Sequence, residues 1–441
     1  MRVLVVADGT RGDVQPMTVL ALQLLLEGHA ITFAAPPSFR TFVESKGLYY
    51  VPLPFDTEAV LKANAEIATG GVREMLGGAR KLFVRTTEGQ LQVLPQLAKR
   101  ADFLLAGGIH AGAPTAAEYA GIPWRWVVYT PIMYPSSSHP PMVSALGRAP
   151  RAVNWLLWKL SARIVHALFA ATLNRERARL GLPVITDAAS HLLCRNPIMA
   201  MEPELAPLPP EWPEAEVIGY LEPGEGEPLA PEIEAFLEAG PPPIYIGFGS
   251  MPDHDAQQTT RLFVEATRAA GVRAVISRGW ADFGRELPEH CLAIGPTAHG
   301  RLFPRMLALV HHGGAGTTAQ AARAGKPQLI VPHAADQFFF GERVHELGIG
   351  VPPLRRTQLS AAALTRRLRT LLSDSTLRAR AAELGARICA RPRPESFSHL
   401  LVDRPGVFLP VLPIGRTVSV APPRLQSMPP PSIRTSVRSP R

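Results

Sequence analysis

The sequence has few cysteines and no long uninterrupted apolar run. Its three cysteines lie far apart and match neither a disulfide framework nor a metal-binding spacing, which favours a reducing compartment. No apolar run approaches the ~20 residues needed to span a bilayer, and the first residues do not have the layout of a signal peptide. The expected location is therefore cytoplasmic. The cysteines are Cys194, Cys291 and Cys389.

Acidic residues are missing from the end of the chain. After Asp403 there are six arginines and no aspartate or glutamate, and without this segment the net charge of +9 falls to +3. Residues 391–441 also contain eleven prolines, a density that cannot sustain a helix. We therefore expect a disordered Pro/Arg-rich tail over 391–441. Because the excess charge belongs to this tail, it does not indicate a nucleic-acid-binding groove.

Strand-like and helical segments alternate along most of the chain, in two series. Such alternation predicts doubly wound parallel sheets, and hence an α/β fold. Between the series, the composition is rich in Pro, Gly and Glu, as is typical of a linker. The prediction is two domains, 1–215 and 243–390, joined by a linker over 216–242. The expected strands are Arg2–Ala7, Ala30–Ala35, Tyr49–Leu53, Phe103–Ala106 and Arg125–Tyr129, then Ile244–Phe248, Ala274–Ser277, Leu292–Ile294, Leu307–Val310 and Gln328–Val331.

Residues 151–180 form one long helical pattern in which aromatic and aliphatic residues are mixed with basic ones. A helix packed over the first domain is the simpler interpretation, because buried helices are commoner. The alternative is a surface that meets lipid or an apolar acceptor. A peripheral membrane contact therefore stays open.

The stretch GTRGDVQP, residues 9–16, combines a glycine-rich turn with a negative charge. It follows a strand-like run and precedes a helix expected from Val14, the usual setting for a phosphate at a helix N-terminus. Asp13, however, places a carboxylate where that phosphate would lie. The turn therefore predicts another role for Asp13, of which capping the helix is the simplest.

A second glycine-rich turn, HHGGAGTT at residues 311–318, suits a diphosphate better. Glycines let the backbone approach an anion, and the helix that follows offers unpaired N–H groups and its positive dipole end. His312 can add a side-chain donor, and Thr317 and Thr318 can add hydroxyl or amide donors. Since no acidic residue lies in the turn, we expect a diphosphate site without a metal ion. A structural turn capped by threonines is the simpler alternative.

The ends of two further predicted strands bring polar groups to the same sheet edge. One strand ends with Gly247, Gly249 and Ser250 at its turn, and Asp336 with Gln337 follow another strand. The carboxyl ends of parallel strands line the crevice of a doubly wound sheet, so these turns should face one ligand. A carboxylate beside an amide can bind neighbouring hydroxyl groups, although Asp336 can also cap the next helix. Together these groups indicate a nucleotide-sugar pocket.

These stretches resemble the inverting glycosyltransferases of the GT-B fold, in which two Rossmann-like domains face each other across a cleft. Within that group the motifs are similar to those of sterol-glucosyltransferase-like enzymes and of antibiotic glycosyltransferases that use UDP- or dTDP-sugars. The resemblance implies an acceptor-binding first domain and a nucleotide-sugar-binding second domain. The matching stretches, from residue 1 to about 389, are GTRGDVQP, GFGSM, AVISRGWADFG, LFPRMLALVHHGGAGTT, AGKPQLIVPHAADQFFFGERVHELGIG and RARAAELGARI.

The resemblance also implies roles for individual residues. They form four groups, which would hold the donor's diphosphate, its nucleoside and its sugar, and border the acceptor. No metal ion is implied, and no cofactor besides the nucleotide-sugar co-substrate. The residues are Ser250, His312, Gly314, Gly316 and Thr317 for the diphosphate; Trp280, Thr297 and His299 for the nucleoside; Asp336 and Gln337 for the sugar; and Thr10, Arg11 and Gly12 for the acceptor-side loop.

For Asp13 the resemblance implies catalysis. Many members of the group carry a histidine at this place, oriented by a separate aspartate, whereas the antibiotic and sterol-type enzymes carry aspartate. A carboxylate facing the cleft can accept the proton of an acceptor hydroxyl as its oxygen attacks the sugar's C1, which inverts the anomeric centre. His312, the backbone amides and the helix dipole would stabilise the leaving diphosphate.

The implied reaction moves a hexose, from UDP-glucose in the first place or a dTDP-sugar in the second, to a hydroxyl group of a lipophilic small molecule. A sterol, terpenoid, polyketide or lipid acceptor is expected because the first domain is rich in aromatic residues. These aromatics can equally belong to the core. They are Trp124, Trp126, Tyr129, Tyr134, Trp155 and Trp158.

Two alternatives from other classes stay open. A nicotinamide-dependent oxidoreductase has a similar fold, but VVADGTRGDV lacks the glycine spacing and the ribose-binding acid of a dinucleotide site.

The second alternative is a catalytically impaired binding protein of the GT-B fold. Similar enzymes continue after the equivalent of residue 389 into a helix that crosses back onto the first domain, and here the Pro-rich tail replaces it. If that tail is disordered, deleting 391–441 is nearly harmless.

Overall fold

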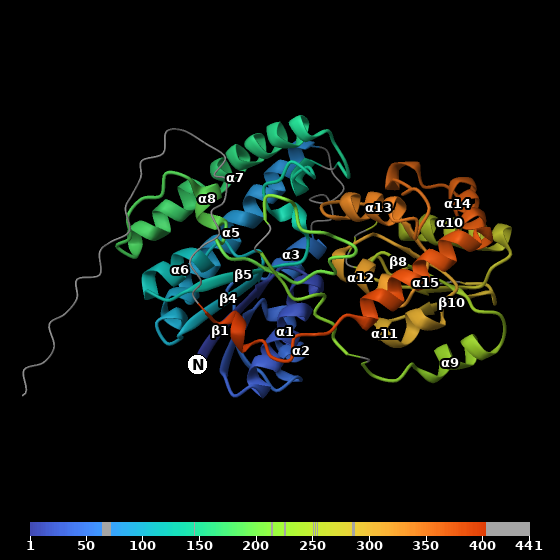
Figure 1. Cartoon of the computed structure of the whole chain (residues 1–441), viewed down its shortest axis with the longest axis horizontal. Helices are drawn as coiled ribbons and strands as arrows, with labels where there is room; N and C mark the ends of the chain where they lie inside the picture. Colours follow the sequence, from blue (N-terminus) through green and yellow to red (C-terminus); the bar gives the residue numbers. More distant parts are fainter. Residues whose placement is uncertain are drawn as a thin grey trace, which may run out of the picture.

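The structure is a computed structural model, and it describes residues 1–63, 72–144, 146–212, 215–224, 226–249, 251, 253, 255–284 and 287–402. Two α/β domains lie side by side, each built on one parallel sheet (Figure 1). The first sheet has seven strands in the order β3-β2-β1-β4-β5-β6-β7, and the second has five in the order β10-β9-β8-β11-β12. The predicted pair of doubly wound domains is confirmed.

In the first domain, helices pack on both faces of the sheet. Its strands are β1 (Arg2–Asp8), β2 (Ala30–Ala35), β3 (Tyr49–Pro52), β4 (Phe103–Gly108), β5 (Trp124–Val128), β6 (Ile198–Met199) and β7 (Glu216–Val217). Its helices are α1 (Arg11–Leu26), α2 (Arg40–Glu44), α3 (Thr57–Ala63), α5 (Val72–Ala98), α6 (Ala113–Ala120), α7 (Arg151–Arg179) and α8 (Ala188–Leu192).

The second domain repeats the plan on a smaller sheet. Its strands are β8 (Ile244–Gly247), β9 (Ala274–Ser277), β10 (Cys291–Ile294), β11 (Leu309–His311) and β12 (Gln328–Ile330). Its helices are α9 (Pro231–Glu238), α10 (Ala256–Ala270), α11 (His299–Leu302), α12 (Ala315–Arg323), α13 (Gln337–Glu346), α14 (Ala361–Ser373) and α15 (Ser375–Ala390).

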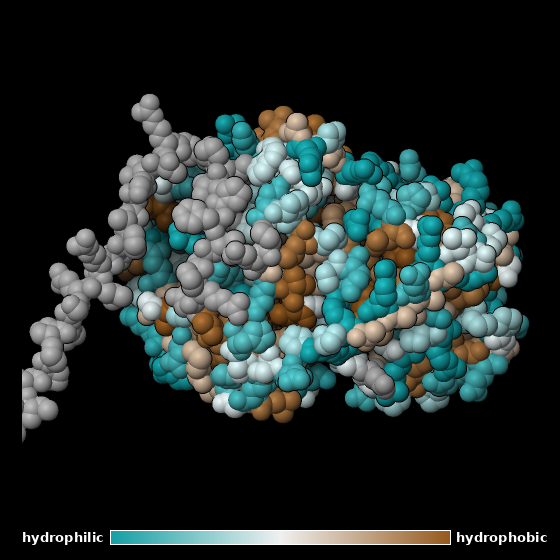
Figure 2. All heavy atoms as spheres, in the orientation of Figure 1, coloured by the Kyte–Doolittle hydropathy of each residue, from teal (hydrophilic) through white to brown (hydrophobic). Residues whose placement is uncertain are grey.

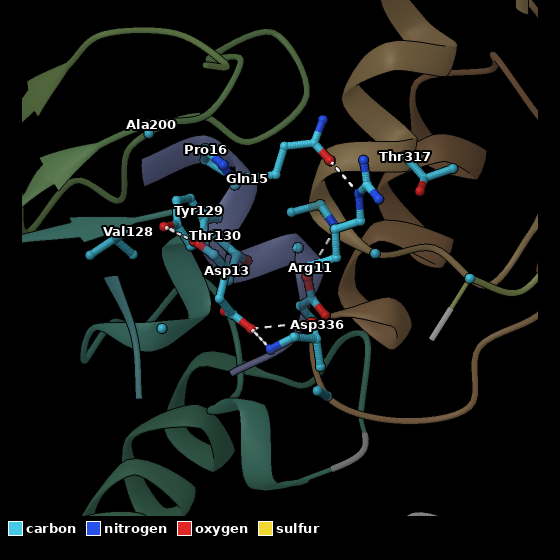
Figure 3. A pocket seen from close by; sticks show the side chains of 18 of the residues that line it. Arg11, Asp13, Gln15, Pro16, Val128, Tyr129, Thr130, Ala200, Thr317 and Asp336 are labelled. Carbon is cyan, nitrogen blue, oxygen red and sulfur yellow. Dashed lines mark hydrogen bonds between the residues drawn. The ribbon is translucent and has the colours of Figure 1, made fainter. Parts of the chain in front are cut away.

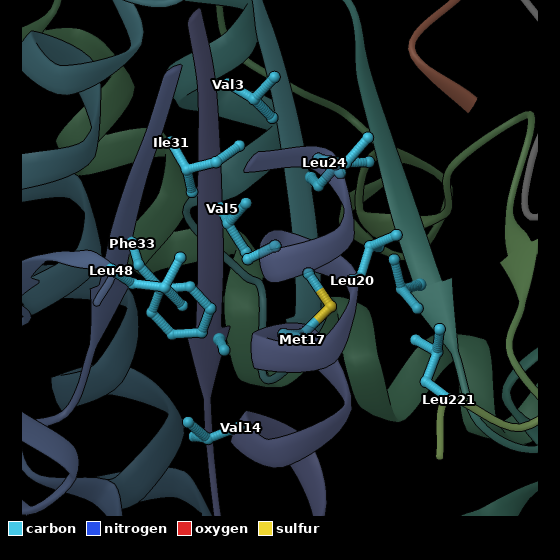
Figure 4. Close-up of a cluster of buried hydrophobic side chains, with 14 of the residues drawn as sticks. Val3, Val5, Val14, Met17, Leu20, Leu24, Ile31, Phe33, Leu48 and Leu221 are labelled. Carbon is cyan, nitrogen blue, oxygen red and sulfur yellow. The ribbon is translucent and has the colours of Figure 1, made fainter. Parts of the chain in front are cut away.

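Helix α1 is fixed on the first sheet by an apolar face. Met17, Leu20 and Leu24 recur at the helical spacing, are fully buried, and pack with side chains of β1 and β2 (Figure 4). Burying a side chain of this size stabilises the fold by roughly 1.5–3 kcal/mol. The N-terminus of α1, which carries Asp13, is therefore held at the end of β1.

Both sheets have a point where strand order reverses. Strands β2 and β3 lie on one side of β1, and β4 to β7 lie on the other; β8 likewise separates β9 and β10 from β11 and β12. Ligands of doubly wound sheets bind outside the carboxyl ends of the strands at such points. The turn after β1 and the turns after β8 and β11 are therefore the expected walls of one cleft.

The predicted linker over 216–242 is wrong at both ends. Its first two residues form β7 at the edge of the first sheet, and Leu221 is buried in the core beneath α1 (Figure 4). Further on, α9 buries Ile233 and Leu237 against the second domain. The sequence did not predict these elements because the segment is rich in Pro, Gly and Glu. Only a few apolar residues, spaced so that each is buried, pack it against the two domains.

The prediction of a disordered tail from residue 391 is also wrong for its first part. Residues 391–402 leave α15 and cross back onto the first domain, where the red segment in Figure 1 lies beside β1 and α1. Leu400 and Leu401 are 0% and 5% exposed, within the same core as α1. The prolines of this stretch prevent a long helix, but an extended segment can still dock. Residues 403–441 lie outside the described residues.

Hydrogen bonds fix the crossing segment. The backbone N–H groups of Phe397 and Ser398 donate to the carboxylate of Glu27, at 2.7 and 2.8 Å. Arg125 donates to the backbone carbonyl of Leu400 at 3.1 Å. These contacts join the two ends of the described chain. We call residues 396–402 the C-terminal strap.

A group of ion pairs joins the domains beside the cleft. Glu202, whose side chain is fully buried, accepts a hydrogen bond from Arg323 of α12 at 3.0 Å and also pairs with Arg391. Arg323 reaches Glu222 at 3.1 Å as well. Helix α12 is thereby tied to the first domain and to the start of the crossing segment.

Candidate active site

A cavity of about 1620 Å³ lies between the two domains. Every predicted site residue that the structure describes lines it, although the chain separates them by up to about 325 residues. Ser250 lies outside the described residues. The lining residues among those predicted are Thr10, Arg11, Gly12, Asp13, Trp280, Thr297, His299, His312, Gly314, Gly316, Thr317, Asp336 and Gln337.

Asp13 lies in the first turn of α1, and its carboxylate folds back over the turn. The helix begins at Arg11 with Thr10 as its N-cap, so the expected helix start at Val14, with Asp13 as the cap, is wrong. Asp13 is the third helical residue, and its Oδ2 accepts hydrogen bonds from the backbone N–H of Thr10 at 2.8 Å and from the Thr10 hydroxyl at 3.2 Å. This reciprocal capping holds the carboxylate in one position.

Two glycines make room for the Asp13 side chain. Gly9 has a φ of +139°, and a Cβ there would collide with the Asp13 carboxylate. Gly108, at the end of β4, has a φ of +66°, and its Cβ would lie 2.9 Å from that of Asp13. The Tyr129 hydroxyl donates to the Asp13 backbone carbonyl at 3.0 Å. Gly108 was not among the predicted site residues; its place two residues after a predicted strand was the signal for it.

The carboxylates of Asp13 and Asp336 face each other across the cleft, one from each domain (Figure 3). Desolvation by the surrounding protein raises the pKa of Asp13 to about 6, although hydrogen bonds from Thr10 partly offset it. Desolvation likewise raises the pKa of Asp336 to about 7, and the charge of Asp13 adds to it. Both groups therefore titrate close to neutral pH.

Sequence reasoning missed a third carboxyl group, that of Asp8 at the end of β1. Asp8 is 1% exposed and accepts hydrogen bonds from the Thr57 hydroxyl at 2.6 Å and from Gln90 Nε2 at 2.9 Å. Desolvation raises its pKa to about 7, and Asp13 contributes. Asp8 precedes the turn that carries Asp13, and it does not line the cavity. The predicted strand stopped one residue before it.

Helix α12 points its N-terminus into the cavity. Gly314 is its N-cap, and the first turn contains Gly316 and Thr317, whose N–H groups have no intrahelical acceptor. The Thr318 hydroxyl donates to the Gly314 carbonyl at 3.0 Å, so it serves the turn and not a ligand. The positive end of the helix and these N–H groups form a site suited to an anion.

The two histidines before α12 have different places. His311 is buried; its Nε2 lies 2.9 Å from Gln328 Oε1, and its Nδ1 accepts from the N–H of Gly313 at 3.1 Å. His312 faces the cavity, and desolvation lowers its pKa to about 3, so its imidazole is neutral at pH 7. A Cβ on Gly314 would lie only 2.6 Å from His312 Nε2. Glycine at 314 is therefore needed for this position of His312.

Asp336 and Gln337 differ in what their side chains can offer a ligand. Gln337 Oε1 accepts from the N–H groups of His333 and Ala334, at 2.7 and 3.0 Å, and so holds its own loop. Asp336 accepts from the N–H of Ala315 at 3.2 Å and presents its carboxylate to the cavity. It precedes α13 but makes no side-chain capping hydrogen bond to it.

Farther along the second domain, aromatic side chains border the cavity. Trp280 follows β9, where Gly279 packs against the backbone carbonyl of Gly249. His299 begins α11 and stacks on Phe303, with ring centroids 4.2 Å apart. Flat rings at this end can contact a nucleobase.

Much of the first-domain wall of the cavity is apolar, although charged residues such as Asp13, Lys46 and Arg195 also line it. Of the six aromatics expected there, three line the cavity, namely Trp126, Tyr129 and Trp158. Tyr134 is instead fully buried in the core, and Trp124 and Trp155 do not reach the cavity wall. Four phenylalanines that sequence reasoning did not single out complete the apolar wall: Phe39, Phe42, Phe83 and Phe169.

Comparisons with known proteins agree with this geometry. Residues 3–123 match the "Glycosyltransferase family 28 N-terminal domain", and residues 275–403 match the "Erythromycin biosynthesis protein CIII-like, C-terminal domain". The chain is 35% identical to vancomycin aglycone glucosyltransferase of Amycolatopsis orientalis, over 80% of this chain and 85% of that protein. It is 33% identical to sterol 3-beta-glucosyltransferase UGT80B1 of Arabidopsis thaliana, over 84% of this chain and 63% of that protein.

A solved structure of similar fold is that of the glycosyltransferase VinC in complex with dTDP. It covers 89% of this chain and 96% of its own, with a TM-score of 0.63 and 21% identity. At that identity the likeness concerns the fold. It confirms the predicted GT-B arrangement of two Rossmann-like domains about a cleft.

Proposed function

Because this chain belongs to the glycosyltransferases of the GT-B fold, we propose that it transfers a hexose from a nucleotide-diphosphate sugar to a hydroxyl group of a lipophilic small molecule, with inversion at C1. UDP-glucose is the first candidate donor and a dTDP-sugar the second. The observation that carries the proposal is the placement of Asp13 and the N-terminus of α12 on opposite walls of one cavity. Membership of this family rules out the oxidoreductase alternative.

Asp13 acts as the general base. An acceptor hydroxyl in the apolar part of the cavity gives its proton to the Asp13 carboxylate while its oxygen forms the bond to C1. The bond from C1 to the diphosphate oxygen breaks on the opposite face, so an α-linked donor yields a β-glycoside. The raised pKa of Asp13, about 6, suits a base that must take a proton near neutral pH.

The second domain stabilises the leaving diphosphate. The N–H groups of Gly316 and Thr317, the dipole of α12 and a neutral His312 surround the place where negative charge develops. Ser250 lies outside the described residues, and the resemblance of GFGSM assigns it to the diphosphate as well. Among the described residues, no group of three or more His, Cys, Asp or Glu side chains is placed to hold a metal ion.

The donor's nucleoside and sugar occupy the remaining walls. Trp280, Thr297 and His299 border the nucleoside, and Asp336 accepts hydrogen bonds from sugar hydroxyls. Gln337 contributes mainly by holding the loop that positions Asp336. The names of two relatives fit this scheme, since one glucosylates vancomycin aglycone and the other a sterol.

A catalytically impaired protein is the remaining alternative. Its basis was the atypical C-terminus, yet residues 391–402 dock on the first domain. A panel of UDP- and dTDP-sugars against sterol, terpenoid, polyketide and lipid acceptors, followed by mass spectrometry, tests transfer directly. From an α-linked donor such as UDP-glucose we expect a product whose anomeric proton coupling, measured by NMR, identifies a β-glycoside. A product that keeps the donor's anomeric configuration would contradict inversion, and UDP binding without any product would favour the impaired protein.

A further inference from the structure

Helix α7 carries an exposed apolar stripe that the proposed active site does not use. Val153, Leu156 and Leu160 are 40, 67 and 51% exposed, and their spacing places them on one helix face. Leu146, just before the helix, is 40% exposed. Four of the ten large hydrophobic side chains that are exposed in the described chain therefore fall between Leu146 and Leu160. Figure 2 shows hydrophobic surface at the top of the view, over α7.

Basic residues lie beside this stripe. Lys159 and Arg163 are exposed on the same side of α7, and Arg151 is exposed where the helix begins. No aspartate or glutamate occurs between Leu146 and Arg175. Leucine and valine flanked by lysine and arginine are typical of helices that lie in the interface of an anionic membrane.

The inner face of α7 belongs to the folded domain. Trp158 and Phe169 are 6% and 8% exposed and line the cavity. By length and composition, α7 is the one described helix that could cross a membrane, but only 28% of its most apolar 18-residue window is buried in the protein. A helix of an ordinary core would be mostly buried. The helix therefore lies along the surface, with the cavity behind it and an apolar, basic stripe outside.

Three partners could cover the apolar stripe, namely a second copy of the chain, the end of this chain or lipid, and charge distinguishes between them. A symmetric contact with a second copy would bring the basic residues of both copies into one interface, with no acidic residue between Leu146 and Arg175 to pair with them. The last 38 residues of the chain carry six arginines and no acid, so they are also unsuited to a basic face. Lipid headgroups with a net negative charge complement the arginines and the lysine, while the acyl region accepts the leucines and the valine.

We propose that this face of α7 docks the protein on an anionic lipid bilayer, with the helix parallel to the membrane plane. The apolar side chains enter the boundary between headgroups and acyl chains, and the basic side chains contact headgroup phosphates. Where the proposed function also holds, this orientation places the acceptor end of the cavity next to the lipid phase. Docking itself requires neither donor nor acceptor.

Vesicle flotation with the full chain tests the proposal. Vesicles of phosphatidylcholine alone are compared with vesicles that contain about a third phosphatidylglycerol, without sugar donor or acceptor. We expect binding to the anionic vesicles and a loss of at least tenfold in the double variant L156S/L160S. The matched control is L25S/L26S in α1, where the leucines are 39% and 80% exposed, and its binding should equal that of the wild type.

A charge variant separates headgroup contact from apolar adhesion. R163E should weaken binding about fivefold or more, as expected for one basic residue at a membrane surface, whereas R366E on the far domain should not. The proposal is overturned if the wild type does not bind anionic vesicles, or if L156S/L160S and R163E bind like their controls. It is also overturned if the wild type is a dimer that L156S/L160S dissociates. None of these results depends on sugar transfer, so they are distinct from a failure of the proposed function.

Discussion

At the scale of single residues, the carboxyl group of Asp13 should make sugar transfer depend on pH. A general base must be ionised, and the pKa of Asp13 is raised to about 6. Below that pH the carboxyl group holds its proton and cannot accept another, so kcat/KM should rise with pH through about 6. The pKa of Asp336 is raised to about 7, so its ionisation should extend the rise in kcat/KM to about pH 7. Rates measured between pH 4.5 and 8.5 check this; a flat profile would contradict it.

Gly314 tests the contact between the α12 turn and His312. Gly314→Ala places a methyl group 2.6 Å from His312 Nε2, so either the imidazole or the turn must move away from the diphosphate. We expect the affinity for UDP to fall about tenfold, or ~1.4 kcal/mol, as measured by calorimetry. The control is Gly77→Ala in α5, where an added Cβ meets nothing within 4 Å. Equal affinities would show that the turn tolerates a side chain.

At the scale of elements, the C-terminal strap should stabilise the first domain. Leu400→Ala removes a fully buried side chain from the core beneath α1, and such a change typically costs about 2–5 kcal/mol. Val402→Ala, at a 49% exposed position, should change the free energy of unfolding by less than about 0.5 kcal/mol. Urea unfolding measures both.

Two truncations, one that removes the C-terminal strap and one that keeps it, should differ in stability. Ending the chain after residue 390 removes the hydrogen bonds to Glu27 and the buried Leu400, so it should destabilise the protein. Ending it after residue 402 keeps them and should not. The expectation from sequence, that deleting 391–441 is nearly harmless, is therefore replaced. Equal stability of the two shortened chains would restore it.

Elements with regular patterns were predictable from sequence, and elements fixed by remote contacts were not. Ten strands follow from alternating patterns, and the edge-forming turns after β1, β8 and β11 follow from their order. The two-residue strands β6 and β7 were not predicted, because they are too short to show a pattern. Helix α1 begins at Arg11 and not at the predicted Val14, because Thr10 and Asp13 cap each other. The strap was missed because its partner, Glu27, lies 371 positions from Ser398, a distance that no local pattern reports. Asp8 was missed because its partners come from helices elsewhere in the domain.

At the scale of the whole molecule, Glu202 should couple the two domains. Its buried carboxylate pairs with Arg323 of α12 and with Arg391. After Glu202→Gln, the two arginines keep Glu222 and Glu204 as partners. The cost should therefore stay below that of a charge left buried and unpaired, which is about 3–5 kcal/mol. We expect the free energy of unfolding to fall by about 1–3 kcal/mol, the typical cost of lost hydrogen bonds to a buried group. Glu346→Gln, in partly exposed pairs with Arg148 and Arg343, should cost less than about 1 kcal/mol.

The central claim is that the first domain supplies the base and the second domain holds the donor. Its most direct test is the turnover of Asp13→Asn with donor and acceptor both saturating. We predict a fall in kcat of about 10²- to 10⁴-fold, with the affinity for UDP within about twofold of the wild type, because Asp13 lies on the wall opposite α12. Normal turnover of Asp13→Asn under these conditions would contradict the account.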